Sequence, residues 1–258
     1  YIPPELREDR GEIARADPVE ARRLLSDALR EPTATITDHR LLRERLTALN
    51  EDLLFGPRVA AGDPISFTYQ IQRGDVLSTL VRRQKLGIDW RLITHVNQLA
   101  RPERIRAGQR IKLVRGPFHA VVSKNAYRLD LYWGDPDRPA EWLFIRSFPV
   151  GLGEYDGTPL GTFVIRKDSR LVNPAWTNPR TGERFSADDP DNPIGEYWIG
   201  LDGVGPAAVH TGYGIHGTIE PDSIGGDESM GCIRMLDDDI KLLYGMLVGG
   251  DTRVVIQP

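Results

Sequence analysis

A single cysteine and a nearby histidine are the residues of this chain whose types and spacing could support covalent chemistry. His216 lies within GIHGT, residues 214–218, and Cys232 lies within SMGCIRM, residues 229–235. A thiol attacks carbonyl groups as the thiolate, and free cysteine has a pKa of about 8.5, so at neutral pH it needs a neighbouring base or cation. A histidine folded back beside the sulfur supplies either role. The pair therefore predicts a cysteine nucleophile with a histidine base.

The glycine that precedes the cysteine fits the same chemistry. Gly231 lets a substrate carbonyl approach the backbone and leaves amide N–H groups free to hold an oxyanion. A cysteine and a histidine picked at random from a chain are more commonly an inert buried thiol and a hydrogen-bonded imidazole. The residue types alone leave both interpretations open.

The composition excludes several classes of site. The 258 residues carry a net charge of −4, with acidic and basic residues interspersed, so we do not expect a nucleic-acid partner. One cysteine excludes an internal disulfide framework and a zinc site with two thiolates. The five histidines show no metal-ligand spacing such as H-E-x-x-H, and we expect neither a metal nor a cofactor.

The sequence contains no candidate membrane-spanning segment. No apolar run approaches the roughly 20 residues of a spanning helix, and the first ten residues, YIPPELREDR, are mostly polar. Because the chain begins with Tyr rather than Met, we expect an N-terminal signal or anchor to be missing from it. Contact with a membrane is expected only through such an anchor.

The N-terminal part predicts a helical hairpin. Residues 1–16 are polar and indicate an extended lead-in. Asp17 is the expected cap of a first helix that ends at Pro32, and a second helix should run from about Asp38 to Gly56. We assign no chemistry to this segment.

The next fifty residues predict a small β-α-α-β module. The pattern Y-x-I-x-x-G-D-x-L, then N-x-L, then I-x-x-G-Q-x-I over residues 67–115 resembles the LysM family. This resemblance implies binding of glycan strands that contain N-acetylglucosamine, in a shallow groove beside two turns. Asp75 is expected to cap the first helix of the module. Val76 stands where the family usually has Thr or Ser, so a module used only for packing is the alternative.

From Phe118 onward the pattern predicts short strands separated by Gly and Pro clusters, which is typical of a β-sandwich or barrel. Residues 173–192 predict a long ordered loop, and residues 237–247 predict a helix near the C-terminus. The whole chain is expected to be α+β. Its expected domains are a helical hairpin with linker over 1–65, a LysM-like domain over 66–116 and a mainly β catalytic domain over 117–258.

The sequence around the cysteine closely resembles the catalytic signature of the YkuD-type L,D-transpeptidases of bacterial peptidoglycan. The signature consists of I-H-G-T, a loop containing S-I-G, and S-x-G-C-I-R-M. Further motifs of the family stand upstream, namely Val150–Gly153, Thr158–Phe163, Asn173–Trp176 and Asn192–Gly195. The resemblance spans about residues 118–258.

The resemblance implies a reaction and a set of site residues. Cys232 would attack the carbonyl between the third and fourth residues of a stem peptide, with His216 as base. The Gly217 carbonyl would orient the imidazole, and the N–H groups of Gly231 and Cys232 would hold the oxyanion. An amine of a neighbouring stem would then resolve the thioester into a 3→3 cross-link. Arg234, Ser229 and Thr218 are the expected substrate-binding residues, and Arg234 would pair with a stem carboxylate.

The resemblance further implies an enzyme of cell-wall biogenesis and cell shape that acts outside the cytoplasm, in the periplasm or cell wall, and that carbapenems inactivate. One departure is Met230, where the family usually has a second histidine; a thioether carries no charge. His210 is a second candidate base, although a surface histidine is the commoner case. Two alternatives stay open: a carboxypeptidase or other hydrolase on the same fold, and a catalytically degenerate peptidoglycan-binding protein.

Overall fold

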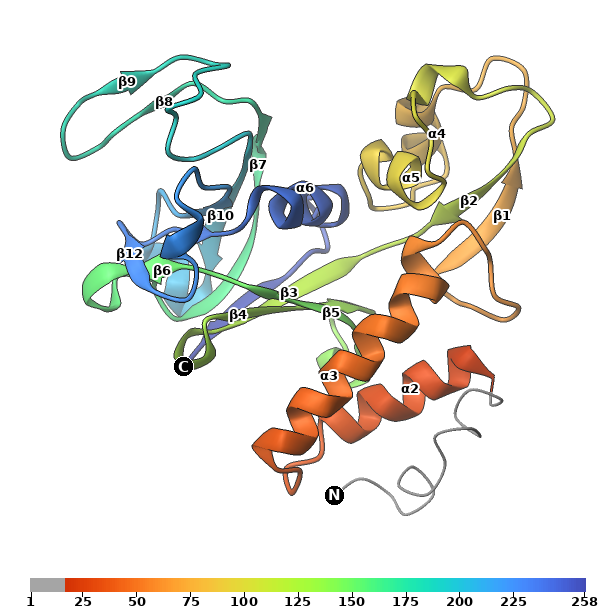
Figure 1. The fold of residues 1–258 in the computed structure, drawn as a ribbon, viewed down its shortest axis with the longest axis horizontal. Helices are drawn as coiled ribbons and strands as arrows, with labels where there is room; N and C mark the ends of the chain where they lie inside the picture. The colour runs from red at the N-terminus through yellow and green to blue at the C-terminus, as the bar shows by residue number, and fades with distance from the viewer. Residues whose placement is uncertain (1–16) are drawn as a thin grey trace. The chain divides into compact units, whose positions relative to one another are not determined.

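The computed structural model describes residues 17–258, and the predicted lead-in over residues 1–16 lies outside them. The chain forms two compact units (Figure 1). The first contains the described residues up to Pro117 together with Leu131–Ser147, and the second contains Phe118–Asp130 and Phe148–Pro258. The first unit holds the helical hairpin and the small β-α-α-β module, and the second holds most of a large sheet.

The helical hairpin consists of α2 (Pro18–Leu29) and α3 (Ile36–Asn50). Asp17 caps α2 as predicted, accepting a hydrogen bond of 3.0 Å from the Val19 N–H. The second helix begins two residues before the predicted Asp38, because Thr35 and Asp38 form a capping box that satisfies the first free N–H groups. A five-residue π-helix, η1 (Glu51–Phe55), extends it to Gly56.

The β-α-α-β order of the small module is confirmed. Its strands β1 (Ser66–Gln70) and β2 (Arg110–Val114) pair antiparallel. Between them lie α4 (Leu77–Arg83), α5 (Trp90–Val96) and the short 3₁₀ helix η2 (Pro102–Arg104).

The predicted cap of α4 is wrong. Its N-cap is Val76, which has no side-chain hydrogen bond. Asp75 instead accepts hydrogen bonds from the Gln72 N–H, the Tyr69 hydroxyl and the Arg83 guanidinium. The bonds from Gln72 and Tyr69 close the turn after β1, and the bond from Arg83 connects this turn to the end of α4.

The buried Lys112 on β2 joins the small module to the end of the helical hairpin. Its ammonium donates to the carbonyl oxygens of Leu53, Gly56 and Arg58, at 2.6, 3.0 and 2.9 Å. All three ammonium hydrogens are therefore used. Burial lowers the pKa of Lys112 to about 8, which leaves the side chain mostly protonated at neutral pH.

A curled sheet, most of which belongs to the second unit, has the strand order β13-β11-β10-β7-β14-β3-β4-β5. The α+β class with a mainly β catalytic domain is confirmed. The strands of this sheet are β3 (Phe118–Ser123), β4 (Arg128–Trp133), β5 (Leu143–Pro149), β7 (Gly161–Val172), β10 (Tyr197–Val204), β11 (Gly214–His216), β13 (Ile233–Arg234) and β14 (Val254–Gln257). The connecting elements are the 3₁₀ helices η3 (Lys124–Ala126), η4 (Pro139–Glu141), η5 (Glu154–Asp156), η6 (Gly205–Val209) and η7 (Pro221–Ser223), the helix α6 (Asp237–Met246), and the strands β6 (Leu152–Gly153) and β12 (Asp227–Ser229).

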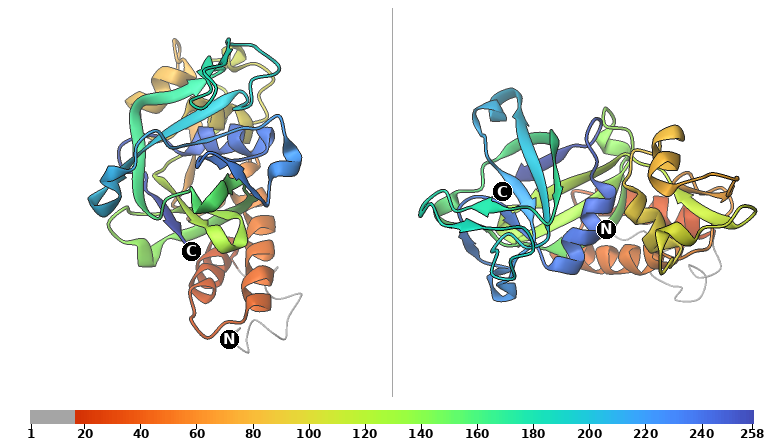
Figure 2. Two further views of the ribbon diagram at one scale, coloured as in Figure 1. Left: turned by 90° about the vertical axis from the view of Figure 1, so that its left-hand side faces the viewer. Right: turned by 90° about the horizontal axis from the view of Figure 1, so that it is seen from above.

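One helix packs against this sheet, and a long loop follows β7. The helix α6 contacts β10, and Figure 2 shows the two elements side by side. The predicted long loop after β7 contains a short hairpin of β8 (Trp176–Thr177) and β9 (Arg184–Phe185). The rings of Trp176 and Phe185 pack 5.9 Å apart and give this loop a small apolar core of its own. Within residues 17–258, no helix combines the length and apolar character needed to cross a bilayer.

We expect Lys112→Met to destabilise the protein by about 2 kcal/mol or more, because three buried carbonyls lose a charged donor while the apolar stem is kept. Urea unfolding would measure the loss. Lys85→Met is the matched control, since Lys85 belongs to the same module and is exposed. Equal stabilities of the two variants would show that the three hydrogen bonds contribute nothing net.

Candidate active site

The pairing of two short strands brings His216 and Cys232 to one face of the sheet. β11 and β13 run parallel, with Ile215 opposite Ile233 and His216 opposite Arg234. Cys232 directly precedes β13, so it lies two residues from Arg234 and its side chain projects from the same face. His216, Cys232 and Arg234 all line one pocket of about 330 Å³. The structure thus places together the residues that the sequence analysis selected as nucleophile, base and substrate-binding arginine.

The imidazole of His216 is buried and has a fixed tautomer. Its Nδ1 lies 2.6 Å from the Gly217 carbonyl oxygen. Because a carbonyl only accepts, Nδ1 carries the hydrogen and the lone pair is on Nε2. Burial lowers the pKa of His216 to about 4; the Gly217 carbonyl opposes this shift and the nearby Arg234 adds to it. The imidazole is therefore neutral at ordinary pH and able to accept a proton.

The indole of Trp198 supports this imidazole. Trp198 lies opposite His216 in the β10–β11 pair, and the two rings stack with centroids 5.7 Å apart and an interplanar angle of 15°. The indole N–H donates to the Ser169 hydroxyl at 3.2 Å. A Cβ atom on Gly214 would lie 2.6 Å from the indole, and one on Gly200 would collide with Ser169. Glycine at both positions therefore gives the indole room to lie across the sheet.

The thiol of Cys232 is protonated in the free protein. The residue is half-buried, and its sulfur makes a long contact of 4.0 Å with the Gly212 carbonyl oxygen. Burial disfavours the charged thiolate and raises the pKa of the Cys232 thiol to about 11. A backbone hydrogen bond from Gly214 and the charge of Arg234 act in the opposite direction. The resting pair is thus a neutral thiol beside a neutral imidazole, not an ion pair.

The turn before the cysteine is held by the hydroxyl of Ser229. This buried hydroxyl donates to the Cys232 carbonyl at 2.6 Å and accepts the Gly231 N–H at 3.0 Å. The Gly231 N–H, expected to hold the oxyanion, is therefore engaged in the free protein. For the Cys232 N–H, residues 17–258 provide no hydrogen-bond acceptor. The geometry favours the Cys232 N–H as oxyanion donor and Ser229 as a residue that shapes the turn.

Two residues outside the predicted site shape the same turn. Gly231 has φ of +125°, and a Cβ there would lie 2.7 Å from the Tyr213 ring. The buried Thr158 hydroxyl donates to the Gly231 carbonyl at 3.0 Å and accepts the Gly153 N–H at 2.8 Å. Thr158 begins the family motif Thr158–Phe163, whereas no sequence signal pointed to Tyr213.

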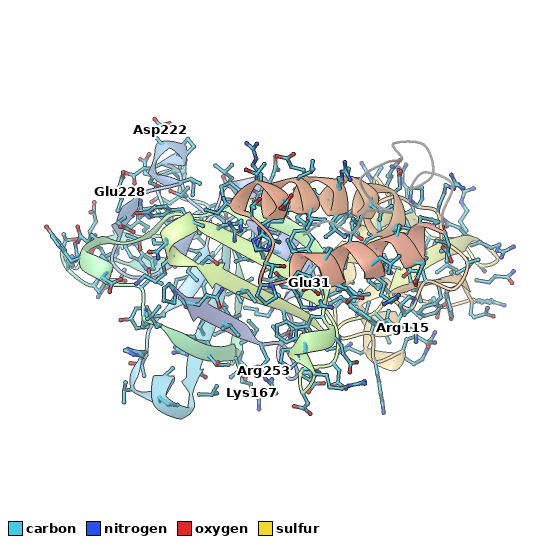
Figure 3. The ribbon with its side chains drawn as sticks, turned by 90° about the horizontal axis from the view of Figure 1, so that it is seen from below. Glu31, Arg115, Lys167, Asp222, Glu228 and Arg253 are labelled. Atoms are coloured by element: carbon cyan, nitrogen blue, oxygen red, sulfur yellow. The ribbon has the colours of Figure 1, made fainter. Side chains whose placement is uncertain are left out.

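The guanidinium of Arg234 is partly available to a ligand. Its Nη1 pairs with a carboxylate oxygen of Glu220 at 3.0 Å, while its buried Nε has no hydrogen-bond partner. Glu220 lies in the loop between His216 and Cys232. Two other acidic residues of this loop, Asp222 and Glu228, project outward (Figure 3). Thr218, also expected to bind substrate, is buried, and its hydroxyl accepts the Glu220 N–H at 3.0 Å, which favours a role in this loop.

The remaining walls of the pocket are mostly apolar. Met230, at the family's histidine position, lines the pocket and is 39% exposed. Trp176 from β8 lines it as well, so the hairpin in the long loop contributes to the site. His210 does not line the pocket; its ring packs edge-on against Tyr213, with centroids 6.0 Å apart.

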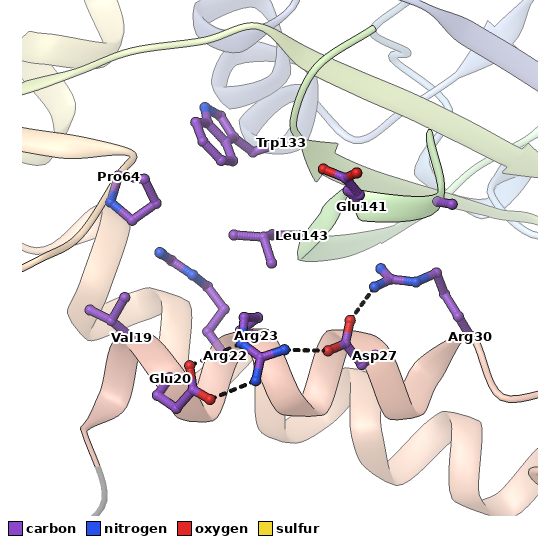
Figure 4. Close-up of a pocket in the computed structure, with 11 residues that line it drawn as sticks. Val19, Glu20, Arg22, Arg23, Asp27, Arg30, Pro64, Trp133, Glu141 and Leu143 are labelled. Carbon is purple, nitrogen blue, oxygen red and sulfur yellow. Dashed lines mark hydrogen bonds and ion pairs between the residues drawn. The ribbon is translucent and has the colours of Figure 1, made fainter. Parts of the chain in front are cut away.

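A second pocket, of about 360 Å³, lies in the first unit and holds no comparable chemistry (Figure 4). Its charged side chains pair with one another: Arg23 binds Glu20 and Asp27, and Arg30 binds Asp27. The buried Arg22 pairs with Asp63. The thiol and the neutral imidazole mark the first pocket as the candidate active site.

A mainly β domain with this cysteine–histidine site matches known proteins along its length. The L,D-transpeptidase catalytic domain family, YkuD, matches residues 117–256, and the LysM domain family matches residues 69–114. Because the first match covers more than half of the chain, the protein belongs to the L,D-transpeptidase family, and it carries a LysM domain.

Relatives support this assignment. The YkuD protein of Bacillus subtilis strain 168 is 30% identical over 200 residues, which cover 73% of this chain and 98% of the relative. The ErfK/SrfK protein of Escherichia coli K12 is 29% identical over 205 residues, which cover 74% of this chain and 59% of the relative. Both are named for L,D-transpeptidase activity. Among solved structures, L,D-transpeptidase 3 of Mycobacterium tuberculosis with a faropenem-derived adduct matches 58% of this chain and 65% of its own, at 16% identity and a TM-score of 0.41.

The neutral resting pair predicts how the thiol reacts with small reagents. The rate of Cys232 alkylation by iodoacetamide should rise about tenfold per pH unit through neutrality and level off near the thiol pKa of about 11. Free cysteine is the control, with a plateau near its own pKa of about 8.5. Since the chain has one cysteine, mass spectrometry gives the rate directly. A plateau reached below pH 7 would instead reveal a resting thiolate–imidazolium pair.

Proposed function

We propose that the protein is a peptidoglycan L,D-transpeptidase that works through a thioester on Cys232. The observation that carries the proposal is the shared face of β11 and β13, which points the thiol and the neutral imidazole of His216 into one pocket. Membership of the L,D-transpeptidase family supports the reaction class. The substrates proposed are stem peptides of peptidoglycan.

The acylation step follows from the protonation states of the pair. The Cys232 sulfur bonds to the substrate carbonyl carbon while Nε2 of His216 takes the thiol proton. The Cys232 N–H stabilises the negative charge on the carbonyl oxygen. The imidazolium then gives its proton to the amine nitrogen of the departing D-alanine as the peptide bond breaks. A thioester and a neutral imidazole result.

The second step forms the new bond. An amine of a neighbouring stem attacks the thioester carbonyl, His216 takes a proton from this amine, and the proton returns to the Cys232 sulfur as it leaves. The product is a 3→3 cross-link. Arg234 is proposed to bind a stem carboxylate, since its buried Nε has no partner and it lines the pocket.

Water in place of the amine would make the same site a carboxypeptidase, because acceptor choice depends on access to the thioester and not on the nucleophile. Mass analysis of the products formed from a tetrapeptide stem with and without an added diamino acid separates the two reactions. The proposal requires a cross-linked or exchanged product when the amine is present. Hydrolysis alone would assign the protein to the hydrolases.

The LysM domain is proposed to bind glycan strands of the same polymer and so to keep the catalytic domain near its substrate. Val76, at the position where LysM domains usually have a hydroxyl side chain, is 58% exposed. Action in the periplasm or cell wall, and the division of the chain at 65/66 and 116/117, stay predictions.

A carbapenem should acylate Cys232, because the thiol would open the strained lactam and no amine would follow to release it. Mass spectrometry of the intact protein should show a single adduct, located on the peptide that contains Cys232. Cys232→Ala should give no adduct and no cross-linking while its melting temperature changes little. An unmodified wild-type protein after long exposure would favour the degenerate-protein alternative.

His216→Ala should slow cross-linking by about 10² to 10⁴, the usual contribution of a positioned acid–base group. His210→Ala is the matched control and should stay close to wild type. The acidic limb of the wild-type pH profile for kcat/KM should lie near pH 4, since activity needs the neutral imidazole and is lost as pH falls through its pKa. If His210→Ala lost activity and His216→Ala kept it, His210 and not His216 would be the base.

A further inference from the structure

The peptide group between Gly217 and Thr218 lies between the imidazole of His216 and the carboxylate of Asp237. Its carbonyl oxygen lies 2.6 Å from Nδ1 of His216. Its N–H, which belongs to Thr218, lies beside the carboxylate of Asp237: burial raises the pKa of this carboxyl, and the N–H acts in the opposite direction. One rigid, planar group therefore stands between the imidazole and an acidic side chain.

The glycines beside this peptide independently place the carboxylate there. A Cβ atom on Gly217 would lie 2.6 Å from Oδ1 of Asp237, and a Cβ on Gly195 would lie 3.0 Å from the same oxygen. The carboxylate thus occupies the space that side chains at both positions would fill. Glycine at 217 is what allows the acid to come so close to the peptide that orients His216.

A stable element supplies the carboxylate. Asp237 is the first residue of α6, whose N-cap Leu236 makes no side-chain hydrogen bond. A negative charge is favourable at this end of a helix. Ile240 and Leu243 of the same helix are fully buried, which anchors α6 in the core. The position of Asp237 is therefore set by packing.

Other hydrogen bonds fix the rest of the turn. The Met235 N–H donates to the His216 carbonyl at 2.9 Å, and the Gly217 N–H donates to the Tyr197 carbonyl at 3.3 Å. The N–H of the Gly217–Thr218 peptide instead faces a side chain, that of Asp237. Without Asp237, this peptide could rotate and take its carbonyl away from the imidazole.

The geometry points to Asp237 as a positioning residue that holds the imidazole of His216 through the Gly217–Thr218 peptide. The inference rests on the proposed function, in which His216 is the base. A hydrogen bond to the N–H of a peptide also polarises its carbonyl, which strengthens the bond that this carbonyl accepts. The acid of a catalytic triad orients its histidine by a direct hydrogen bond. Asp237 would orient His216 indirectly, through the peptide group between them.

The hydrogen-bond acceptor should matter more than the negative charge. Asp237 is exposed, so water screens its charge toward the imidazole. Asparagine keeps an acceptor oxygen at the same place and should therefore substitute for it. Alanine removes the acceptor.

The test compares Asp237→Ala, Asp237→Asn and the control Asp238→Ala in the full chain. Asp238 is also exposed and in the first turn of α6. Asp237→Ala should lower the maximal rate of Cys232 acylation by a carbapenem about tenfold, at the lower end of losses for partners that orient a histidine. The half-saturating concentration should not change. Asp237→Asn should stay within about twofold of wild type, and Asp238→Ala should behave as wild type.

A second readout does not need catalysis. The His216 Nδ1–H, in its hydrogen bond to Gly217, should give a downfield proton signal in NMR spectra that Asp237→Ala shifts upfield and Asp237→Asn preserves. Melting temperatures check that every variant folds. An unshifted signal together with a wild-type acylation rate in Asp237→Ala would overturn the inference, as would Asp237→Asn behaving like Asp237→Ala. A wild-type protein that is not acylated would count against the proposed function, and the NMR signal alone would then decide the role of Asp237.

Discussion

The parallel pairing of β11 with β13 is the constraint on which the site depends. A one-residue slip of β13 would turn Cys232 away from His216 and move Arg234 out of the pocket, because side chains alternate between the faces of a sheet. β13 has two residues and β11 has three, so the strands themselves cannot hold this register. The hydrogen bonds of Ser229 and Thr158 before Cys232, and the bond from the Met235 N–H to His216 after it, fix the register from both sides.

Glycines, which have no side chain, shape this site as much as the larger residues do. Gly200 and Gly214 leave room for the Trp198 indole, and Gly217 leaves room for the Asp237 carboxylate. The indole stacks on the imidazole of His216, and the carboxylate lies beside the peptide whose carbonyl binds that imidazole. The environment that lowers the pKa of His216 is thus assembled from several segments, and no single motif contains it.

Local sequence signals predicted much of the fold and part of the site. Helix α2, the β-α-α-β order of the small module and the joint presence of Cys232 and His216 followed from capping residues, periodicity and motif letters. The cap at Asp75 was predicted wrongly because its carboxylate has three competing donors in the folded turn. The strands β11 and β13 are too short to show the alternation of polar and apolar residues from which a strand is predicted. The contribution of Trp198 could not be predicted either, since it depends on residues far apart in the chain.

The high pKa of the Cys232 thiol has a consequence for chemical durability. Oxidants such as peroxide attack the thiolate, and cysteines that act as redox sensors have low pKa values. A thiol with a pKa of about 11 presents little thiolate to such oxidants at neutral pH. The burial that makes the free thiol a weak nucleophile therefore also preserves it.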